Sequence, residues 1–239
     1  MIEKIENPED LNEWRGRDIY SIRILALAKS YSTKYNFCTF YRQTDGKRVT
    51  ALISKLDNNV TLSLTDGYDR DELVQFFCLT GYSSILCDAS FELNPRFEEG
   101  DVMVCNAKRE LLPQNYYIDE YPKLMDLFNF VDYNAQDFKA WYVDISHRVR
   151  HKTAKAFTLN IDGEIISSGI LSSIYDNYAI LTAVRTNPEH RGQGFGSLLV
   201  KNICCEVSGD VYIMREQGRN ESFYEQLGFK NIGKWRMYQ

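Results

Sequence analysis

The sequence predicts an α/β protein built from two tandem units. Two Asp-Gly pairs, Asp45-Gly46 and Asp162-Gly163, each stand between apolar runs that alternate in polarity, and such a pair predicts a β-hairpin. The two pairs lie 117 residues apart, and the turn residues Asn58 and Asn177 that follow lie 119 apart. With 239 residues, the chain is long enough for two domains of ordinary size.

The first unit reads as strand, turn, strand, turn, strand, helix, strand. Its helix is predicted by Asp69 as a candidate N-cap and by Gly81 as a candidate C-cap. Its predicted apolar stripe is Leu73, Val74, Phe77 and Cys78. We expect strands at 36–43, 48–56, 60–64 and 83–87 and the helix at 69–81.

The second unit repeats this order. A helix is predicted to start near Gly194, with Leu198, Leu199, Ile203 and Val207 at helical spacing and a break at 209–210. An amphipathic helix is predicted at 137–151, with the stripe Phe138, Trp141, Tyr142, Ile145 and Val149. We expect strands at 155–160, 165–171, 179–184 and 211–214. Pro113 marks the connector, so the predicted domains are 1–112 and 113–239.

Composition narrows the classes of partner. The formal net charge is −5, whereas nucleic-acid binders carry an excess of basic residues. No nucleic-acid partner is therefore expected. No apolar run is long enough for a membrane span, and the first residues, MIEKIENPEDLNEW, lack the pattern of a secretory signal. The six cysteines form no CxxC pair, which favours buried free thiols. We therefore expect a cytoplasmic protein without a membrane partner.

The stretch RGQGFG (191–196) places three of the 14 glycines within five positions. It lies between a predicted strand and a predicted helix, where unpaired backbone N–H groups and the helix dipole favour a phosphate. Bare backbone lets such a ligand approach closely. The Walker A pattern GxxxxGK[ST] is absent, and the spacing and hairpin context do not fit the dinucleotide fingerprint. The simpler alternative is a tight strand-to-helix turn.

Two blocks carry a family resemblance. TAVRTNPEHRGQGFGSLLV (182–200) resembles the acetyl-CoA-binding motif of the GNAT acyltransferase superfamily, with Arg191, Gly194 and Gly196 at its fixed positions. NESFYEQLGF (220–229) resembles the family's FYxxxGF signature. The resemblance covers about residues 120–239, and the first half matches only in its order of elements. It implies two GNAT-like units, each a mixed, mostly antiparallel sheet flanked by helices, of which the first is degenerate and lacks the glycine loop.

The resemblance also implies roles for individual residues. Tyr224 matches the tyrosine that protonates the departing thiolate of coenzyme A, although the alternative is an aromatic residue packed in the core. The backbone of Val184, Arg185 and Thr186 would pair with the pantetheine arm. The pyrophosphate would lie against Arg191 and the backbone of Gly192, Gln193, Gly194, Phe195, Gly196 and Ser197.

One position departs from the family pattern. Many members have an asparagine seven residues before the tyrosine, where this chain has Gln217. Asn220 either takes over the cofactor contact or caps the helix that carries Tyr224. The general base is left open among Glu164, Asp176, Glu189, His190 and Glu216. His147 and His151 stand four residues apart but have no further ligand, so no metal is expected.

The resemblance implies an N-acetyltransferase that moves an acetyl group from acetyl-CoA to a primary amine. The alternative is a non-catalytic acyl-CoA-binding or regulatory module. The expected partner is a small-molecule or peptide amine, and a homodimer is left open.

Overall fold

The computed structural model describes residues 1–14, 18–106, 117–132 and 134–239, and they form two units. Unit 1 comprises Met1–Val102, Met214–Arg219 and Ile232–Gln239, and unit 2 comprises Met103–Ile213 and Asn220–Asn231. The boundary predicted at residue 113 lies outside the described residues and stays a prediction. Strands β6 (Phe97–Cys105), β11 (Val211–Glu216) and β12 (Lys230–Tyr238) each supply residues to both units, so the units differ from a single cut of the chain.

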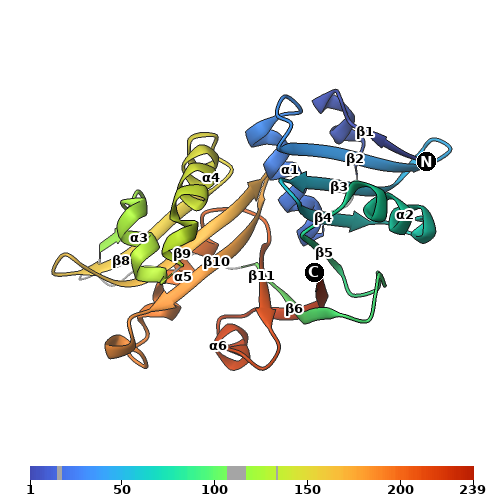
Figure 1. Ribbon diagram of the computed structural model, residues 1–239. Coiled ribbons are helices and arrows are strands. Elements are labelled where there is room, and N and C mark those ends of the chain that lie inside the picture. Colours follow the sequence, from blue (N-terminus) through green and yellow to red (C-terminus); the bar gives the residue numbers. More distant parts are fainter. Residues whose placement is uncertain (15–17, 107–116, 133) are drawn as a thin grey trace. The chain divides into compact units, whose positions relative to one another are not determined.

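Unit 1 is built on an antiparallel meander (Figure 1). Both predicted turns are confirmed: Asp45 pairs with Arg48 across the first, and Leu56 pairs with Asn59 across the second. Strand β5 runs parallel to β4, and the C-terminal strand β12 returns to pair antiparallel with β5. The bounds are β1 Ile2–Lys4, β2 Cys38–Asp45, β3 Arg48–Leu56, β4 Asn59–Leu64 and β5 Ser84–Asp88.

The described residues of unit 1 form two α-helices, and α2 (Arg70–Thr80) confirms the predicted helix. The Asp69 side chain accepts a hydrogen bond from the Glu72 N–H, and Gly81 ends the helix with φ 68°. The predicted stripe is wrong at Cys78, which is exposed; Leu73 and Phe77 of α2 are buried, and Val74 packs against the same core while partly buried. Helix α1 (Ile19–Tyr31), which was not predicted, contacts strands β2 to β5. A short 3₁₀ helix, Pro8–Glu13, precedes it.

Unit 2 repeats the meander with β8 (Lys155–Ile161), β9 (Glu164–Tyr175) and β10 (Tyr178–Thr186). The second Asp-Gly hairpin is confirmed, since Asp162 and Gly163 form its turn with φ 51° and 86°. The short strand β7 (Tyr117–Asp119) pairs with β8, and β11 runs parallel to β10. The helices are α3 Leu124–Val131, α4 Phe138–Arg150, α5 Phe195–Cys204 and α6 Glu221–Gln226, and the short 3₁₀ helices are Ala135–Asp137 and Pro188–His190.

Alternate residues of β9 in unit 2 join two different apolar clusters. Leu171 packs in the cluster that contains Leu199 and Ile203 of α5. Ile170 packs with Leu127 of α3 and Ile145 of α4. The residues i and i+1 of a strand point to opposite faces, so α5 covers one face of the meander and the α3–α4 pair covers the other.

Two helix predictions in unit 2 need correction. Helix α5 ends at Cys204, so Val207 lies beyond it although it packs against the same core. In α4 only Ile145 is buried, and Tyr142 of the predicted stripe is 43% exposed. The amphipathic pattern predicted the helix correctly but overestimated how much of it the sheet covers.

The α/β class is confirmed, with mostly antiparallel strands flanked by helices in each unit. All six cysteines are free; Cys38, Cys87, Cys105 and Cys204 are buried, Cys205 is partly buried and Cys78 is exposed. Within the described ranges, no helix has the length and apolar character needed to cross a membrane.

Candidate functional site

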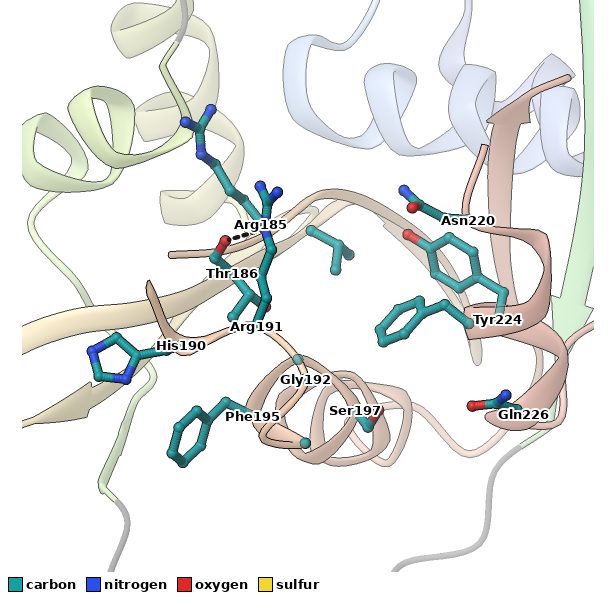
Figure 2. A pocket seen from close by; sticks show the side chains of 14 residues that line it. Arg185, Thr186, His190, Arg191, Gly192, Phe195, Ser197, Asn220, Tyr224 and Gln226 are labelled. Carbon is teal, nitrogen blue, oxygen red and sulfur yellow. Dashed lines mark hydrogen bonds between the residues drawn. The ribbon is translucent and has the colours of Figure 1, made fainter. Parts of the chain in front are cut away.

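Unit 2 contains a cavity of about 620 Å³ at the end of β10 and the start of α5. Figure 2 shows Tyr224 and Asn220 on one side of it and Arg185, Thr186 and His190 on the other. It is lined by Val184, Arg185, Thr186, His190, Arg191, Gly192, Gly194, Phe195, Gly196, Ser197, Asn220, Phe223, Tyr224 and Gln226. Of the twelve predicted site residues, all but Gln193 are therefore brought together.

The β10 backbone supplies an open strand edge to this cavity. On one side, β10 pairs with β9 as far as Thr186. On its other side it pairs with β11 only at Ala179 and Ile180. From Leu181 onward, no described strand is paired with this second edge, so its N–H and C=O groups are available to a ligand that lies alongside as an extra strand would.

The same stretch of β10 contains a β-bulge. Thr182 pairs with Ile170 and Arg185 pairs with Ser168, so Ala183 and Val184 lie opposite Gly169 alone. Ala183 has φ 54°, a left-handed value that is uncommon for a residue with a side chain. Bulges concentrate beside functional sites because they redirect the backbone. The bulge was not predicted from the sequence; the local feature that accompanies it is the polar pair Ser167-Ser168 on β9.

Gly192 and Gly194 have a conformational role in the loop. They adopt φ 76° and 87°, and a Cβ added at either would meet no atom within 4 Å. Left-handed backbone is accessible to glycine at little cost, whereas other residues pay about 1–2 kcal/mol for it. Steric crowding within the protein therefore does not explain these two glycines; the path of the loop does.

Gly196 has a different role, which is close packing. A Cβ on Gly196 would lie 2.7 Å from the Thr186 Oγ1 and 3.6 Å from the Phe223 ring. The start of α5 therefore sits directly against the end of β10 and against α6. This contact brings the open strand edge and the helix start to the same cavity.

The start of α5 suits an anion. Gly194 is its N-cap, no side chain caps it, and its first turn carries no acidic residue. The first N–H groups of an α-helix have no partner within the helix, and the helix dipole makes this end positive. Arg191 adds a guanidinium beside it, whose Nε donates to the Thr186 carbonyl at 3.3 Å.

The segment 220–229 folds into the short helix α6 and a turn that fixes it. Gly228 turns the chain with φ 90°, and the Phe229 N–H donates to the Tyr224 carbonyl at 3.0 Å. Phe229 is buried, and its ring lies 5.4 Å from the Tyr224 ring. The spacing of the FYxxxGF block thus places two aromatic residues on the cavity wall, Phe223 and Tyr224, with Phe229 as the buried anchor.

The Tyr224 phenol is held as a neutral proton donor. Its ring is partly buried and packs against Phe223 at 5.0 Å, and Figure 2 shows its hydroxyl pointing away from α6 into the cavity. Burial, with a smaller effect from the Cys204 thiol, raises the pKa of Tyr224 to about 12. A phenol with this pKa keeps its proton at neutral pH and can give it to a stronger base that forms beside it.

Of the remaining predicted residues, some line the cavity and others do not. Asn220 stands at the N-cap position of α6, but its side chain makes no capping hydrogen bond; it lines the cavity next to Tyr224 instead. The structure therefore does not support the capping interpretation. Gln193 does not line the cavity, and its Nε2 donates to the Glu189 carbonyl at 3.3 Å. Among the five candidate bases, His190 lines the cavity and the other four do not.

A comparison with family models finds a match in the second half of the chain. The model described as an acetyltransferase (GNAT) domain matches residues 152–231. Residues 152–231 belong to a GNAT domain. The match runs from β8 to the first residues of β12 and includes every residue that lines the cavity.

Solved structures extend the likeness to both units. A Drosophila protein is 15% identical with a TM-score of 0.68, covering 99% of this chain and 97% of its own. A tandem GNAT protein from the clavulanic acid biosynthesis pathway is 13% identical with a TM-score of 0.60 and the same coverage. A GCN5-related N-acetyltransferase from Kribbella flavida is 13% identical with a TM-score of 0.59, over 92% and 93%. These likenesses establish the tandem GNAT fold. Among curated proteins, none matches the chain in sequence.

Proposed function

We propose that the second unit transfers an acetyl group from acetyl-CoA to a primary amine. The observation that carries the proposal is the meeting, in one cavity, of an open strand edge, an uncapped helix start and a neutral phenol. Acetyl-CoA has an amide-rich arm, which the strand edge can bind, and a pyrophosphate, which the helix start can bind. Its thioester sulfur becomes a thiolate, which the phenol can protonate. The acceptor is proposed to be a small-molecule or peptide amine.

The residues present fit such a ligand. The backbone of Val184, Arg185 and Thr186 offers strand-like hydrogen bonds to the amide-rich arm. The loop from Arg191 to Ser197 offers positive charge, positive-φ glycines and the N–H groups of the first turn of α5 to the pyrophosphate. Asn220 lines the cavity beside Tyr224, so we also assign it to the cofactor side of the site.

The proposed reaction is direct transfer. The amine nitrogen attacks the thioester carbonyl carbon, a C–N bond forms and the C–S bond breaks. The leaving thiolate takes the phenol proton of Tyr224, and the proton lost by the amine leaves to solvent, from which the phenol is protonated again. Holding both reactants in one site supplies much of the rate, and backbone N–H groups that polarise the carbonyl supply more.

Thiol release from acetyl-CoA over a panel of amines, combined with calorimetry of acetyl-CoA binding, tests the proposal. We expect Tyr224→Phe to lower kcat by about 100-fold or more, the range of general acid catalysis, while acetyl-CoA still binds. Tyr178→Phe is the matched control because it removes a phenol hydroxyl on β10 that does not line the cavity. Tight binding without thiol release on any amine would favour a non-catalytic acyl-CoA module, and absence of binding would refute both functions.

A further inference from the structure

Two buried serines of β9 hold the bulge in β10. The Ser168 Oγ donates to the Ala183 carbonyl at 3.0 Å, and the Ser167 Oγ donates to the Arg185 carbonyl at 2.9 Å. The Ser167 Oγ also lies 3.1 Å from the Thr186 Oγ1. Both serines have no exposed surface. Their hydroxyls therefore bond to the β10 backbone at Ala183, within the bulge, and at Arg185, where its pairing with β9 resumes.

These contacts determine where the neighbouring N–H groups point. No described peptide bond is cis, and in a trans peptide the C=O and the following N–H point in opposite directions. Because the Ala183 carbonyl accepts from Ser168, the N–H of Val184 points away from Ser168. By the same argument the Thr186 N–H points away from Ser167. Val184 and Thr186 both line the cavity, on the stretch of β10 whose second edge is paired with no strand among the described residues.

The left-handed backbone at Ala183 needs such support. A residue with a side chain in this region carries a conformational cost, and it persists only where surrounding contacts fix it. Gly169, which lies opposite the bulge, is also constrained, since a Cβ there would lie 2.6 Å from the Ile203 Cδ1 of α5. The bulge is thus fixed from β9 by hydroxyls and from α5 by packing.

We propose that Ser167 and Ser168 are positioning residues, which act through the β10 backbone by aiming the Val184 and Thr186 N–H groups into the cavity. Neither serine lines the cavity itself. The inference rests on the proposed acetyl transfer, in which a backbone N–H aimed at the thioester carbonyl stabilises the developing oxyanion. Such donors act in proportion to how accurately they are placed.

Ser168→Ala tests the proposal, with Ser173→Ala as the matched control. Ser173 is a buried serine of the same strand, but it lies opposite Ile180, separated from the bulge at Ala183 by another register shift. We expect Ser168→Ala to lower kcat about tenfold, less than the loss of a whole oxyanion donor, with little change in the KM for acetyl-CoA. Ser168→Thr, which keeps the hydroxyl, should recover most of the rate, and Ser173→Ala should stay within about twofold of the parent.

A second readout separates this inference from the proposed function. The amide resonance of Val184 in ¹⁵N-valine-labelled protein without ligand should shift in Ser168→Ala and not in Ser173→Ala. If the unaltered protein releases no thiol with any amine, the proposed function fails, and the Val184 resonance still decides whether Ser168 orients this backbone. An unchanged Val184 resonance, or equal kcat losses in the two alanine variants, overturns the inference. If Ser168→Ala does not fold, Ser167→Ala is measured in the same way through Thr186.

Discussion

The contact between Gly196 and Thr186 gives a prediction whose size follows from the structure. Gly196→Ala adds a Cβ that would lie 2.7 Å from the Thr186 Oγ1, closer than real Cβ atoms come to their neighbours. Overpacking of this kind costs about 1–3 kcal/mol, and the better helix propensity of alanine returns at most about 1 kcal/mol. Thr186→Ala removes the Oγ1 that would clash with the new Cβ, and losing the contact of this Oγ1 with Ser167 costs about 1 kcal/mol.

The two substitutions should therefore be strongly non-additive. In the double variant the clash disappears, so we expect it to be about 2 kcal/mol more stable than the sum of the single effects predicts. For a chain of this length that corresponds to about 4–8 °C in Tm, measured by thermal unfolding. Gly163→Ala is the control, because a Cβ there meets no atom within 4 Å, and its effect should add to that of Thr186→Ala. Additive effects of Gly196→Ala and Thr186→Ala would refute the packing argument.

Three further predictions concern proton transfer, stability and stoichiometry. Because burial raises the pKa of Tyr224 to about 12 and the protonated phenol is the active form, kcat should not fall between about pH 8 and pH 10; a loss centred near 10 would contradict this. Arg215→Ala should destabilise the protein by about 3–5 kcal/mol in denaturant unfolding, because it leaves the buried Asp101 carboxylate unpaired. Arg219→Ala is the control: it breaks the exposed ion pair with Glu216 and should cost under about 1 kcal/mol. Calorimetry should give one equivalent of acetyl-CoA per chain, and two equivalents would show that unit 1 also binds it.

Local signals predicted the parts of the fold that local chemistry determines. The Asp-Gly and asparagine turns have residues suited to their backbone angles, so both meanders were predictable. Helix α2 was predictable because Asp69 and Gly81 mark its ends. Helix α1 was missed because it is buried on nearly every side and therefore shows no apolar stripe. The return of β12 to β5 was missed because pairing across about 150 residues leaves no trace in a short window of sequence.

The site was predictable in its residue types and less so in its geometry. The glycine loop and the FYxxxGF block indicated which segments meet, and the cavity brings them together. The reasons for the glycines differ, however, since Gly194 serves the backbone path and Gly196 serves the contact with Thr186. The bulge at Ala183 was not predictable, because hydroxyls from another strand hold an alanine in a conformation that its own identity disfavours.

The two units differ at the start of the helix for which we propose phosphate binding in unit 2. In both, the helix follows the third strand of a meander and leads to a parallel strand. The start of α2 is occupied by the Asp69 carboxylate, and its first turn carries Asp71 and Glu72, so an incoming anion would meet negative charge. The start of α5 has Gly194 as its N-cap and no acidic residue in its first turn.

The strand that precedes each helix also differs between the units, in the regularity of its pairing. The pairing of β3 with β4 runs without interruption from Ala51 to Leu56, whereas the pairing of β9 with β10 breaks at Ala183. In the described part of unit 1, the start of α2 is therefore capped and the β3–β4 pair before it has no bulge. Replacing Asp69 by glycine would open the helix start alone, and the strand beside it would still present a regular edge. Two independent features would have to change together, which is why we expect acetyl-CoA to bind unit 2 and not unit 1.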